Sequence, residues 1–383
     1  MTAIAVDSVD AVRHTIRDAK SRGAGLRVIG RGSWLDAGRV VRAAGSLSTR
    51  ELTGIVDYVP GDLTLTARAG TTLAELRDAT AAHRQWLALD PAGRVEGTIG
   101  ATVATASAGP LATCFGSPRD LVLGLEFVTG DGTIARGGGR VVKNVAGFDL
   151  TRLLTGSWGT LGVITEVTVR LHARPEADLS LGVPIAGDAG DVARIREALR
   201  RFPFTPYACE ILNAPLARAI GAVGSAGPSI ALFRLGGNGE AVDAQRSALV
   251  EIGTPSDIDP EAWTRLRSAE PPDAFVFRLS RRPSEIAAVW REAMRVAEGC
   301  PGTLVHARPH KGVVRCIVPA SDAAEASLSP LLASVQSTRV GERLSAGLWR
   351  VAFPPPHHAT DARVKTAFDP TGTLNPGIFG EVE

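Results

Sequence analysis

The sequence predicts an α+β protein of two domains, followed by a C-terminal tail. The chain has 383 residues, which is long enough for two hydrophobic cores. Strand and helix patterns alternate up to residue 171, whereas short β-rich segments separated by helical ones follow from residue 178. The arrangement of segments from residue 178 onward favours an antiparallel sheet with helices on one face.

The start of the chain has clear helix and strand signals. The opening helix has an apolar face formed by Val9, Val12, Ile16 and Ala19. A strand over 26–29 follows, and residues 63–70 alternate between apolar and polar as in a half-buried strand. Thr72 and Glu75 then stand at the spacing of a capping box, which predicts a helix that begins there.

Turn signals mark the later organisation. Residues 121–139 predict two strands joined by a Gly-Asp-Gly turn, and the mixed charges and proline of 172–178 predict a domain boundary. The Pro-rich stretch 353–358, which ends in His357 and His358, predicts a linker. The expected domains are therefore 1–175, 176–352, and a linker with a tail over 353–383.

Composition excludes several classes of protein. Lys and Arg total 42 against 40 for Asp and Glu, and aromatic residues are few, so neither a nucleic-acid partner nor an anionic membrane surface is expected. The uncharged run 97–118 is too rich in Gly, Ala, Ser and Thr for a transmembrane segment, and the N-terminus lacks a secretory pattern. We expect a cytoplasmic protein, held at most peripherally at the inner face of the cell membrane through partners.

The four cysteines show no metal-binding spacing. The chain contains Cys114, Cys209, Cys300 and Cys316. None forms a C-x-x-C pair, so we expect reduced thiols and neither an iron–sulfur cluster nor a zinc site within this chain.

Three stretches rich in small residues, 28–34, 97–118 and 153–165, suggest backbone that approaches a bulky, partly anionic cofactor. The first contains Gly30-Arg31-Gly32-Ser33 directly after a strand, where successive N–H groups could surround a pyrophosphate. The alternative is a turn that needs glycine for steric reasons alone. The loop is not a Rossmann fingerprint, because Leu35 replaces the third glycine.

The second stretch offers hydroxyl, methyl and N–H groups to a flat ring or a phosphate. Its candidate cofactor-facing residues are Thr98, Gly100, Ala101, Thr102, Thr105, Ala106 and Gly109. The competing explanation is tight packing against a sheet, which also requires small residues.

Taken together, several motifs in fixed order resemble the FAD-binding (PCMH-type) domain of the vanillyl-alcohol oxidase type flavoproteins, and among them the flavoprotein subunits of bacterial glycolate oxidases. The resemblance covers roughly residues 20–175 plus the tail, and the region 180–350 matches only loosely. It is carried by PGDLTLTARAGTTLAEL (60–76), QWLALDP (85–91), TIGATVATASAG (98–109), FGSPRDLVLGLEFVTGDG (115–132), KNVAGFDLTRLLTGSWGTLGVITEVTVRL (143–171) and FDPTGTLNPG (368–377).

The resemblance implies FAD as cofactor and assigns it binding residues. In such proteins the Gly30–Ser33 loop and the Thr98–Gly109 run clasp the pyrophosphate. By the same resemblance the remaining positions are Pro91 beside the flavin, Gly162, Val163 and Ile164 by the adenine end, and Asn375 from the returning tail. Covalent members of the family often use a His in the first loop, where this chain has Trp34 and Leu35. We therefore expect dissociable FAD, with Cys114 as the only nearby nucleophile.

The second domain departs from relatives that oxidise D-2-hydroxy acids. Those relatives carry a segment resembling H-x-x-x-x-x-H that binds metal, and a Glu-His-Gly farther on. Here His306 and His310 stand near the matching place, but Arg308 and Lys311 flank them with positive charge. No Glu-His-Gly occurs in the sequence. His306, His310 and Arg308 are thus weak catalytic candidates, or else remnants on a hairpin, and no metal site is expected.

The resemblance implies an FAD-binding subunit of a multi-subunit 2-hydroxyacid (glycolate) oxidase, active in electron transfer and assembly. A separate catalytic flavoprotein subunit and an iron–sulfur subunit would complete such a complex. The first alternative is a self-sufficient FAD-dependent D-2-hydroxyacid (D-lactate-type) dehydrogenase, with His306 or His310 as base and Arg308 binding the substrate carboxylate. The second is an assembly scaffold that has kept the fold and lost FAD.

Overall fold

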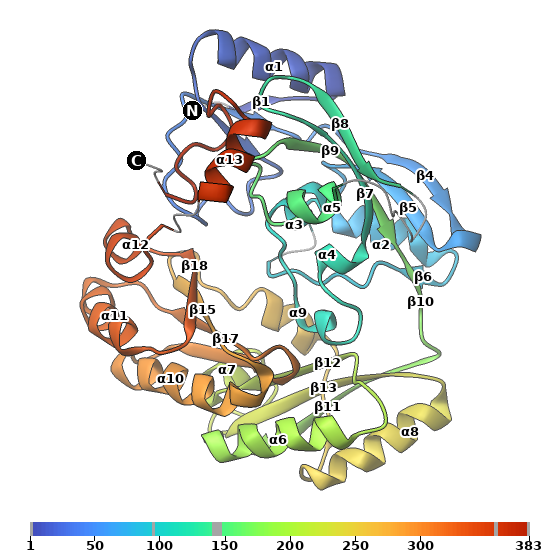
Figure 1. Cartoon of the computed structure of the whole chain (residues 1–383). Coiled ribbons are helices and arrows are strands. Elements are labelled where there is room, and N and C mark those ends of the chain that lie inside the picture. Colours follow the sequence, from blue (N-terminus) through green and yellow to red (C-terminus); the bar gives the residue numbers. More distant parts are fainter. Residues whose placement is uncertain (1–2, 94–95, 140–147, 356–358, 381–383) are drawn as a thin grey trace. The chain divides into compact units, whose positions relative to one another are not determined.

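The chain folds into two compact units in a computed structural model that describes residues 3–93, 96–139, 148–355 and 359–380 (Figure 1). The first unit comprises Met1–Ala108, Gly116–Arg174 and Pro355–Glu383. The second comprises Gly109–Phe115 and Pro175–Pro354. The uncharged run 97–118 therefore contributes to both units.

The first unit is built on a five-stranded antiparallel sheet and a three-stranded parallel one. The larger sheet has the order β4-β5-β9-β7-β8, the smaller one β1-β3-β2, and β6 pairs with β10. The strands are β1 (Ala3–Ala5), β2 (Leu26–Ile29), β3 (Gly45–Ser48), β4 (Ile55–Val59), β5 (Thr64–Arg68), β6 (Gln85–Trp86), β7 (Val122–Val128), β8 (Ile134–Gly138), β9 (Val163–Arg170) and β10 (His172–Ala173). The helices are α1 (Val9–Ser21), α2 (Leu73–Ala81), α3 (Ile99–Ala104), α4 (Pro118–Leu121), α5 (Leu150–Leu154) and α13 (Ala359–Phe368).

Local sequence signals place several of these elements as predicted. Ser8 caps α1, and the apolar face of α1 packs in a core with β2 and β3. Thr72 and Glu75 form the expected capping box: Glu75 N–H donates to Thr72 Oγ1 at 3.1 Å, and Thr72 N–H donates to Glu75 Oε2 at 2.7 Å. The β7–β8 hairpin turns through Gly132, whose φ of 83° lies in the region that favours glycine.

The C-terminal tail returns to the first unit, as predicted. Leu374 forms a parallel bridge with Leu26 of β2, and Gly130 N–H donates to Phe368 O at 2.8 Å. Asp369 is 2% exposed and accepts hydrogen bonds from Lys365 Nζ at 2.5 Å and Leu374 N–H at 2.8 Å. These contacts fix the segment that leads to Asn375.

The second unit is an eight-stranded antiparallel sheet in the order β14-β11-β13-β12-β16-β17-β15-β18. Its strands are β11 (Ala177–Ile185), β12 (Ala208–Leu212), β13 (Ser229–Gly237), β14 (Ser256–Asp257), β15 (Phe275–Ser280), β16 (Leu304–Arg308), β17 (Val313–Val318) and β18 (Thr338–Arg343). Its helices are α6 (Ala189–Arg201), α7 (Ala214–Ala219), α8 (Gly239–Ala248), α9 (Glu261–Arg267), α10 (Ile286–Gly299), α11 (Asp322–Ser334) and α12 (Ala346–Ala352).

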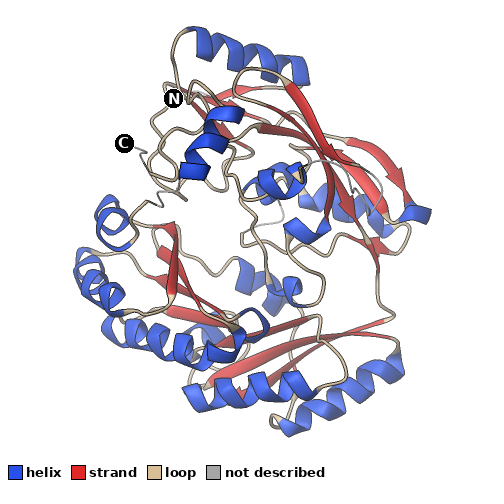
Figure 2. Cartoon of the chain, viewed as in Figure 1, coloured by secondary structure: helices blue, strands red, loops and turns tan. Residues whose placement is uncertain are grey.

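The longer helices of this unit cover one face of the sheet, as the predicted α+β class requires (Figure 2). Alternate strand residues such as Cys209 and Ile211 pack there against α6 and α10. The residues between them, Ala208 and Leu212, instead pack with α7 and α9 on the opposite face. The prediction of helices on one face therefore missed these two short helices, because their apolar residues are too few to show a periodicity.

Two further predictions concern a transmembrane segment and the linker that contains His357 and His358. None of the helices within the described residues has both the length and the apolar character needed to cross a bilayer. His357 and His358 lie outside the described residues, so their assignment to a linker stays a prediction.

Candidate functional site

A loop with unused backbone donors follows β2 in the first unit. Gly32 has a φ of 88°, so the chain turns there in a conformation that favours glycine. Within the described residues, the N–H groups of Gly30, Arg31, Gly32 and Ser33 donate to no protein acceptor. Adjacent N–H groups without an internal acceptor form a concave site for an anion.

The α3 segment contacts this loop, but the first N–H groups of α3 already donate to acceptors within the protein. Gly100 N–H donates to Ala69 O at 2.9 Å, and Ala101 N–H donates to Thr98 Oγ1 at 3.2 Å. A Cβ at Gly100 would lie 2.7 Å from Ala69 Cβ, and one at Gly30 would lie 2.6 Å from Thr98 Oγ1. The small residues of this stretch therefore do serve tight packing, which was the competing explanation for them.

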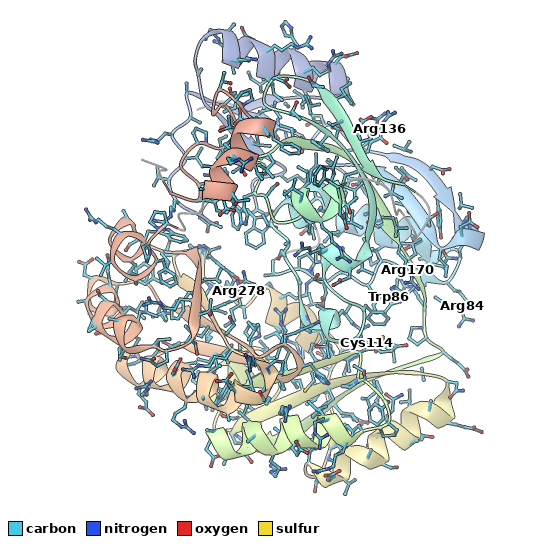
Figure 3. The ribbon with its side chains drawn as sticks, viewed as in Figure 1. Arg84, Trp86, Cys114, Arg136, Arg170 and Arg278 are labelled. Carbon is cyan, nitrogen blue, oxygen red and sulfur yellow. The ribbon has the colours of Figure 1, made fainter. Side chains whose placement is uncertain are left out.

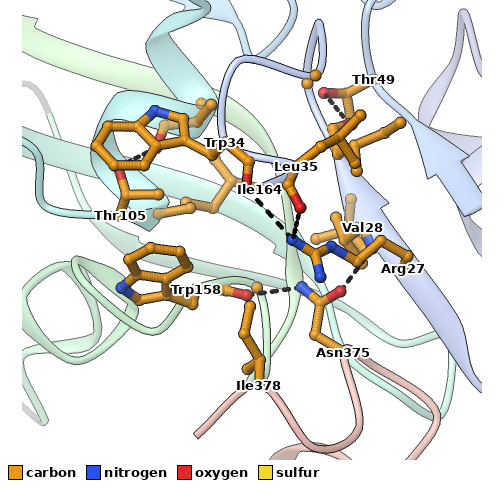
Figure 4. A pocket seen from close by; sticks show the side chains of 18 of the residues that line it. Arg27, Val28, Trp34, Leu35, Thr49, Thr105, Trp158, Ile164, Asn375 and Ile378 are labelled. Carbon is orange, nitrogen blue, oxygen red and sulfur yellow. Dashed lines mark hydrogen bonds between the residues drawn. The ribbon is translucent and has the colours of Figure 1, made fainter. Parts of the chain in front are cut away.

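Asn375 joins the tail to the same region (Figure 4). Its Oδ1 accepts from Val28 N–H at 2.8 Å, and its Nδ2 donates to Trp158 O at 2.7 Å. The side chain is 3% exposed, and the residue has a φ of 45°, a conformation that Asn tolerates better than most residues. Asn375 thereby holds β2 and the Trp158 turn at a fixed separation.

These segments enclose a pocket within the first unit. Ten of the sixteen predicted cofactor-binding residues line it: Gly30, Gly32, Ser33, Gly100, Ala101, Thr105, Gly162, Val163, Ile164 and Asn375. The other six do not: Arg31, Pro91, Thr98, Thr102, Ala106 and Gly109. Arg31 is exposed, Thr98 and Thr102 are buried in the start of α3, and Gly109 belongs to the second compact unit.

The pocket also contains three side chains that the sequence reasoning missed. Trp34 and Trp158 line it with ring centroids 5.8 Å apart in an edge-to-face arrangement. Arg27 projects from β2, and its Nη2 donates to the carbonyls of Trp34 and Leu35, both at 3.3 Å (Figure 4). A signal for Arg27 existed, because it alternates with the core residues Leu26 and Val28 and must face the other side of the strand.

The donors and shape of this pocket fit a flavin dinucleotide. Unused N–H groups and a guanidinium suit a diphosphate, while Val163, Ile164 and the indole rings suit a flat aromatic ring. Gly30, Gly32, Gly100 and Gly162 are among the residues that line the cavity. The residues present therefore match the chemistry of FAD.

Two of the three weak catalytic candidates, His306 and Arg308, lie on the second unit's sheet, where both contact one carboxylate. His306 Nδ1 lies 2.8 Å from Glu210 Oε2, and Arg308 Nε lies 3.0 Å from Glu210 Oε1. Glu210 is fully buried. The sequence reasoning missed Glu210 because strands β12 and β16 are distant in sequence and meet only through the sheet.

His310 is separate from this pair in the fold. It lies in the short 3₁₀ helix Pro309–Lys311 after β16, and burial together with the charge of Lys311 lowers its pKa. Its Nδ1 is buried without a hydrogen-bond partner among the described residues. Across residues 3–93, 96–139, 148–355 and 359–380, no three His, Cys, Asp or Glu side chains gather as metal ligands.

An ionic network extends across the same sheet. Arg315 of β17 pairs with both Glu270 and Glu342. The Nε atom of Arg278, a residue labelled in Figure 3, lies 2.7 Å from Glu342 Oε1. Burial raises the pKa of Glu342, but the charges of Arg315 and Arg278 outweigh burial and hold that pKa at about 2. Burial likewise lowers the pKa of Arg315, and its two carboxylate partners raise it above its ordinary value.

Comparison with known proteins identifies the first unit. Residues 2–138 match the family model described as an FAD binding domain. A solved structure of alkyldihydroxyacetonephosphate synthase superposes with a TM-score of 0.69 at 16% identity, covering 98% of this chain and 76% of that one. At that identity the likeness establishes the fold alone.

Curated relatives match part of the chain. Glycolate oxidase subunit GlcE of Escherichia coli (strain K12) is 42% identical over 176 residues, 46% of this chain and 50% of the relative. Glycolate oxidase subunit GlcD of Bacillus subtilis (strain 168) is 36% identical over 132 residues, 34% of this chain and 28% of that protein. D-lactate dehydrogenase of Archaeoglobus fulgidus is 38% identical over 157 residues, 40% of this chain and 35% of that enzyme.

The chain thus spans half or less of the length of these curated relatives. The family match, the fold and the pocket agree on a flavin dinucleotide as the ligand of the first unit. Through residues 2–138, the chain therefore contains an FAD binding domain.

Proposed function

We propose that the chain is the FAD-binding subunit of a multi-subunit 2-hydroxyacid (glycolate) oxidase, where it takes part in electron transfer and assembly. The observation that carries the proposal is the pocket of the first unit, which brings ten predicted FAD-binding residues together in a chain 42% identical to a glycolate oxidase subunit over 176 residues. The names of the relatives point to 2-hydroxy acids as the substrate class, namely glycolate and D-lactate.

Oxidation of a 2-hydroxy acid to a 2-oxo acid releases two electrons and two protons. Bound FAD supplies the two-electron acceptor chemistry that amino-acid side chains lack. The chain's own residues orient the cofactor: the Gly30–Ser33 loop offers donors, and Val163 and Ile164 exclude water. Asn375 keeps the walls of the pocket at a fixed separation through its two backbone bonds.

The second unit supports a subunit role. In a hydroxyacid dehydrogenase, a base takes the hydroxyl proton and a cation binds the carboxylate. Here both candidate groups, His306 Nδ1 and Arg308 Nε, already contact Glu210, which neutralises the guanidinium. We propose that a separate catalytic flavoprotein subunit oxidises the substrate and an iron–sulfur subunit receives the electrons.

Purification of the chain alone tests the proposal. We expect a yellow protein whose FAD is released by heat without proteolysis, because no covalent bond to the chain is predicted. Dye-linked turnover of glycolate or D-lactate should be negligible alone and should appear when the catalytic and iron–sulfur subunits are added. Strong turnover by the isolated chain would contradict the subunit role.

One observation favours the alternative of a self-sufficient D-2-hydroxyacid dehydrogenase. Because Glu210 contacts His306 through Nδ1, the Nε2 atom is left as the proton acceptor when the imidazole is neutral. Under this alternative, His306→Asn abolishes turnover by the isolated chain, whereas the exposed His14→Asn on α1 does not. Under the subunit role, His306→Asn changes neither FAD content nor complex formation.

A further inference from the structure

The pocket of the first unit contains one ionisable side chain that can pair with an anion. Among its described lining residues, only Arg27 carries a charge, and no Asp or Glu faces it across the cavity. Burial lowers the pKa of Arg27, because the guanidinium leaves water without a carboxylate to compensate. This pocket therefore carries an uncompensated positive charge.

The contacts of Arg27 leave part of its guanidinium available. Its Nη2 donates to the carbonyls of Trp34, Leu35 and Ala37 at 3.3 to 3.4 Å. Within the described residues, Nε and Nη1 have no acceptor and the side chain makes no ion pair. A guanidinium has five donors in a fixed fork, so three long bonds from one nitrogen do not use it fully.

Three other partly buried arginines in this chain are neutralised by carboxylates. Arg308 contacts Glu210, Arg315 contacts Glu270 and Glu342, and Arg281 Nη2 lies 2.8 Å from Glu292 Oε1. Arg27 differs from all of these. It also lies in the same pocket lining as Gly30, Gly32 and Ser33, whose N–H groups donate to no protein acceptor.

We propose that Arg27 pairs with the diphosphate of FAD and completes the phosphate site formed by the Gly30–Ser33 loop. The inference rests on the FAD-binding assignment of the domain and does not depend on the subunit role. A guanidinium binds phosphate oxygens through charge-assisted hydrogen bonds, which are stronger than neutral ones. The same side chain positions the loop, because its remaining nitrogen holds the loop carbonyls.

Ligand titrations of the full-length apoprotein distinguish diphosphate binding from a purely structural brace. Tryptophan emission reports occupancy, because Trp34 and Trp158 line the pocket. FAD and ADP carry the diphosphate, whereas riboflavin carries no phosphate. In Arg27→Met we expect the Kd for FAD and ADP to rise about ten- to a hundredfold, and the Kd for riboflavin to stay within about twofold.

The control is Arg50→Met, at an exposed arginine that pairs with Glu51 on the surface. It should leave all three Kd values unchanged. Salt should weaken FAD binding to the wild-type protein more than to Arg27→Met, because salt screens the charge pair. If Arg27→Met does not fold, Arg27→Gln replaces it, because the glutamine retains an amide donor for the loop carbonyls. The Kd values for FAD, ADP and riboflavin are then compared in the same way.

Three results would overturn the proposal. A parallel loss of FAD, ADP and riboflavin affinity would assign Arg27 to loop support alone, and unchanged affinities would give it no role. Competition by glycolate, without competition by ADP, would identify the anion as a substrate carboxylate. Failure of the wild-type protein to bind FAD would remove the domain assignment itself, which is a distinct outcome.

Discussion

The pocket of the first unit and the charged sheet face of the second handle charge in opposite ways. On the sheet, Arg315 contacts two carboxylates and Glu210 contacts two cationic or ionisable groups. In the pocket, Arg27 and the N–H groups of Gly30–Ser33 have no anionic partner among the described residues. Polar groups that neutralise one another belong to the fold, whereas polar groups left uncompensated beside a cavity mark the place for a ligand.

The largest effect is expected from breaking the compensated network. Arg315→Met leaves the carboxylates of Glu270 and Glu342 without their shared cation, so the free energy of unfolding should fall by about 3–5 kcal/mol. Chemical denaturation at pH 7 measures it. Arg291→Met, at an exposed arginine of α10, is the matched control. A loss below about 1 kcal/mol would show that the network is not structural.

Acid should weaken the same network in a defined pH window. The pKa of Glu342 is lowered from 4.5 to about 2, so its contribution is complete above pH 4.5 and disappears as the pH falls through 2. Glu342→Gln should therefore be less stable than wild type by on the order of 3 kcal/mol at pH 7, and this difference should close between pH 4.5 and 2. Denaturation at several pH values, with the exposed Glu261→Gln as control, tests this; a constant difference would contradict it.

The pocket should be sensitive to added volume at Gly100, because α3 packs tightly against Ala69. In Gly100→Ala the new methyl group meets Ala69 Cβ at 2.7 Å and Ala69 O at 2.8 Å, so α3 must shift at a cost of about 1–3 kcal/mol. We expect purified Gly100→Ala to contain less FAD per chain, measured by flavin absorbance. Gly61→Ala adds a methyl group where no atom lies within 4 Å and should retain full FAD content. Equal FAD content in both variants would refute the packing argument.

The smallest effect is expected where no charge is compensated. In the absence of FAD, Arg27→Met loses long hydrogen bonds but also removes a desolvated charge, so the free energy of unfolding should change by about 1 kcal/mol or less. Thermal unfolding of Arg27→Met, Arg315→Met and the wild-type protein, all without FAD, compares the contributions of the two arginines to stability. A loss as large as that of Arg315→Met would place Arg27 among the structural charges.

Local signals in the sequence predicted local structure well. The Thr72–Glu75 capping box and the turn at Gly132 involve residues within four positions of each other, and both form as expected. The glycine spacing also located much of the pocket, since Gly30 and Gly100 both line it. Backbone approach leaves a direct mark on sequence because a larger residue is sterically excluded.

Contacts between residues on strands far apart in the chain could not be predicted from local sequence patterns. Glu210 and His306 are separated by 96 positions and meet because β12 and β16 are neighbours in the sheet. Arg27 was missed because a single arginine in a strand does not reveal whether a carboxylate lies opposite it. The resemblance to a family supplied Asn375, whose place in the pocket depends on the returning tail.

The amino-acid sequence by itself determined where helices and hairpins begin, and that the chain carries the motifs of an FAD-binding domain. Only the tertiary structure decided which charges are neutralised. Compensation depends on distances of about 3 Å between side chains far apart in the chain, and those distances exist only after the sheets have formed.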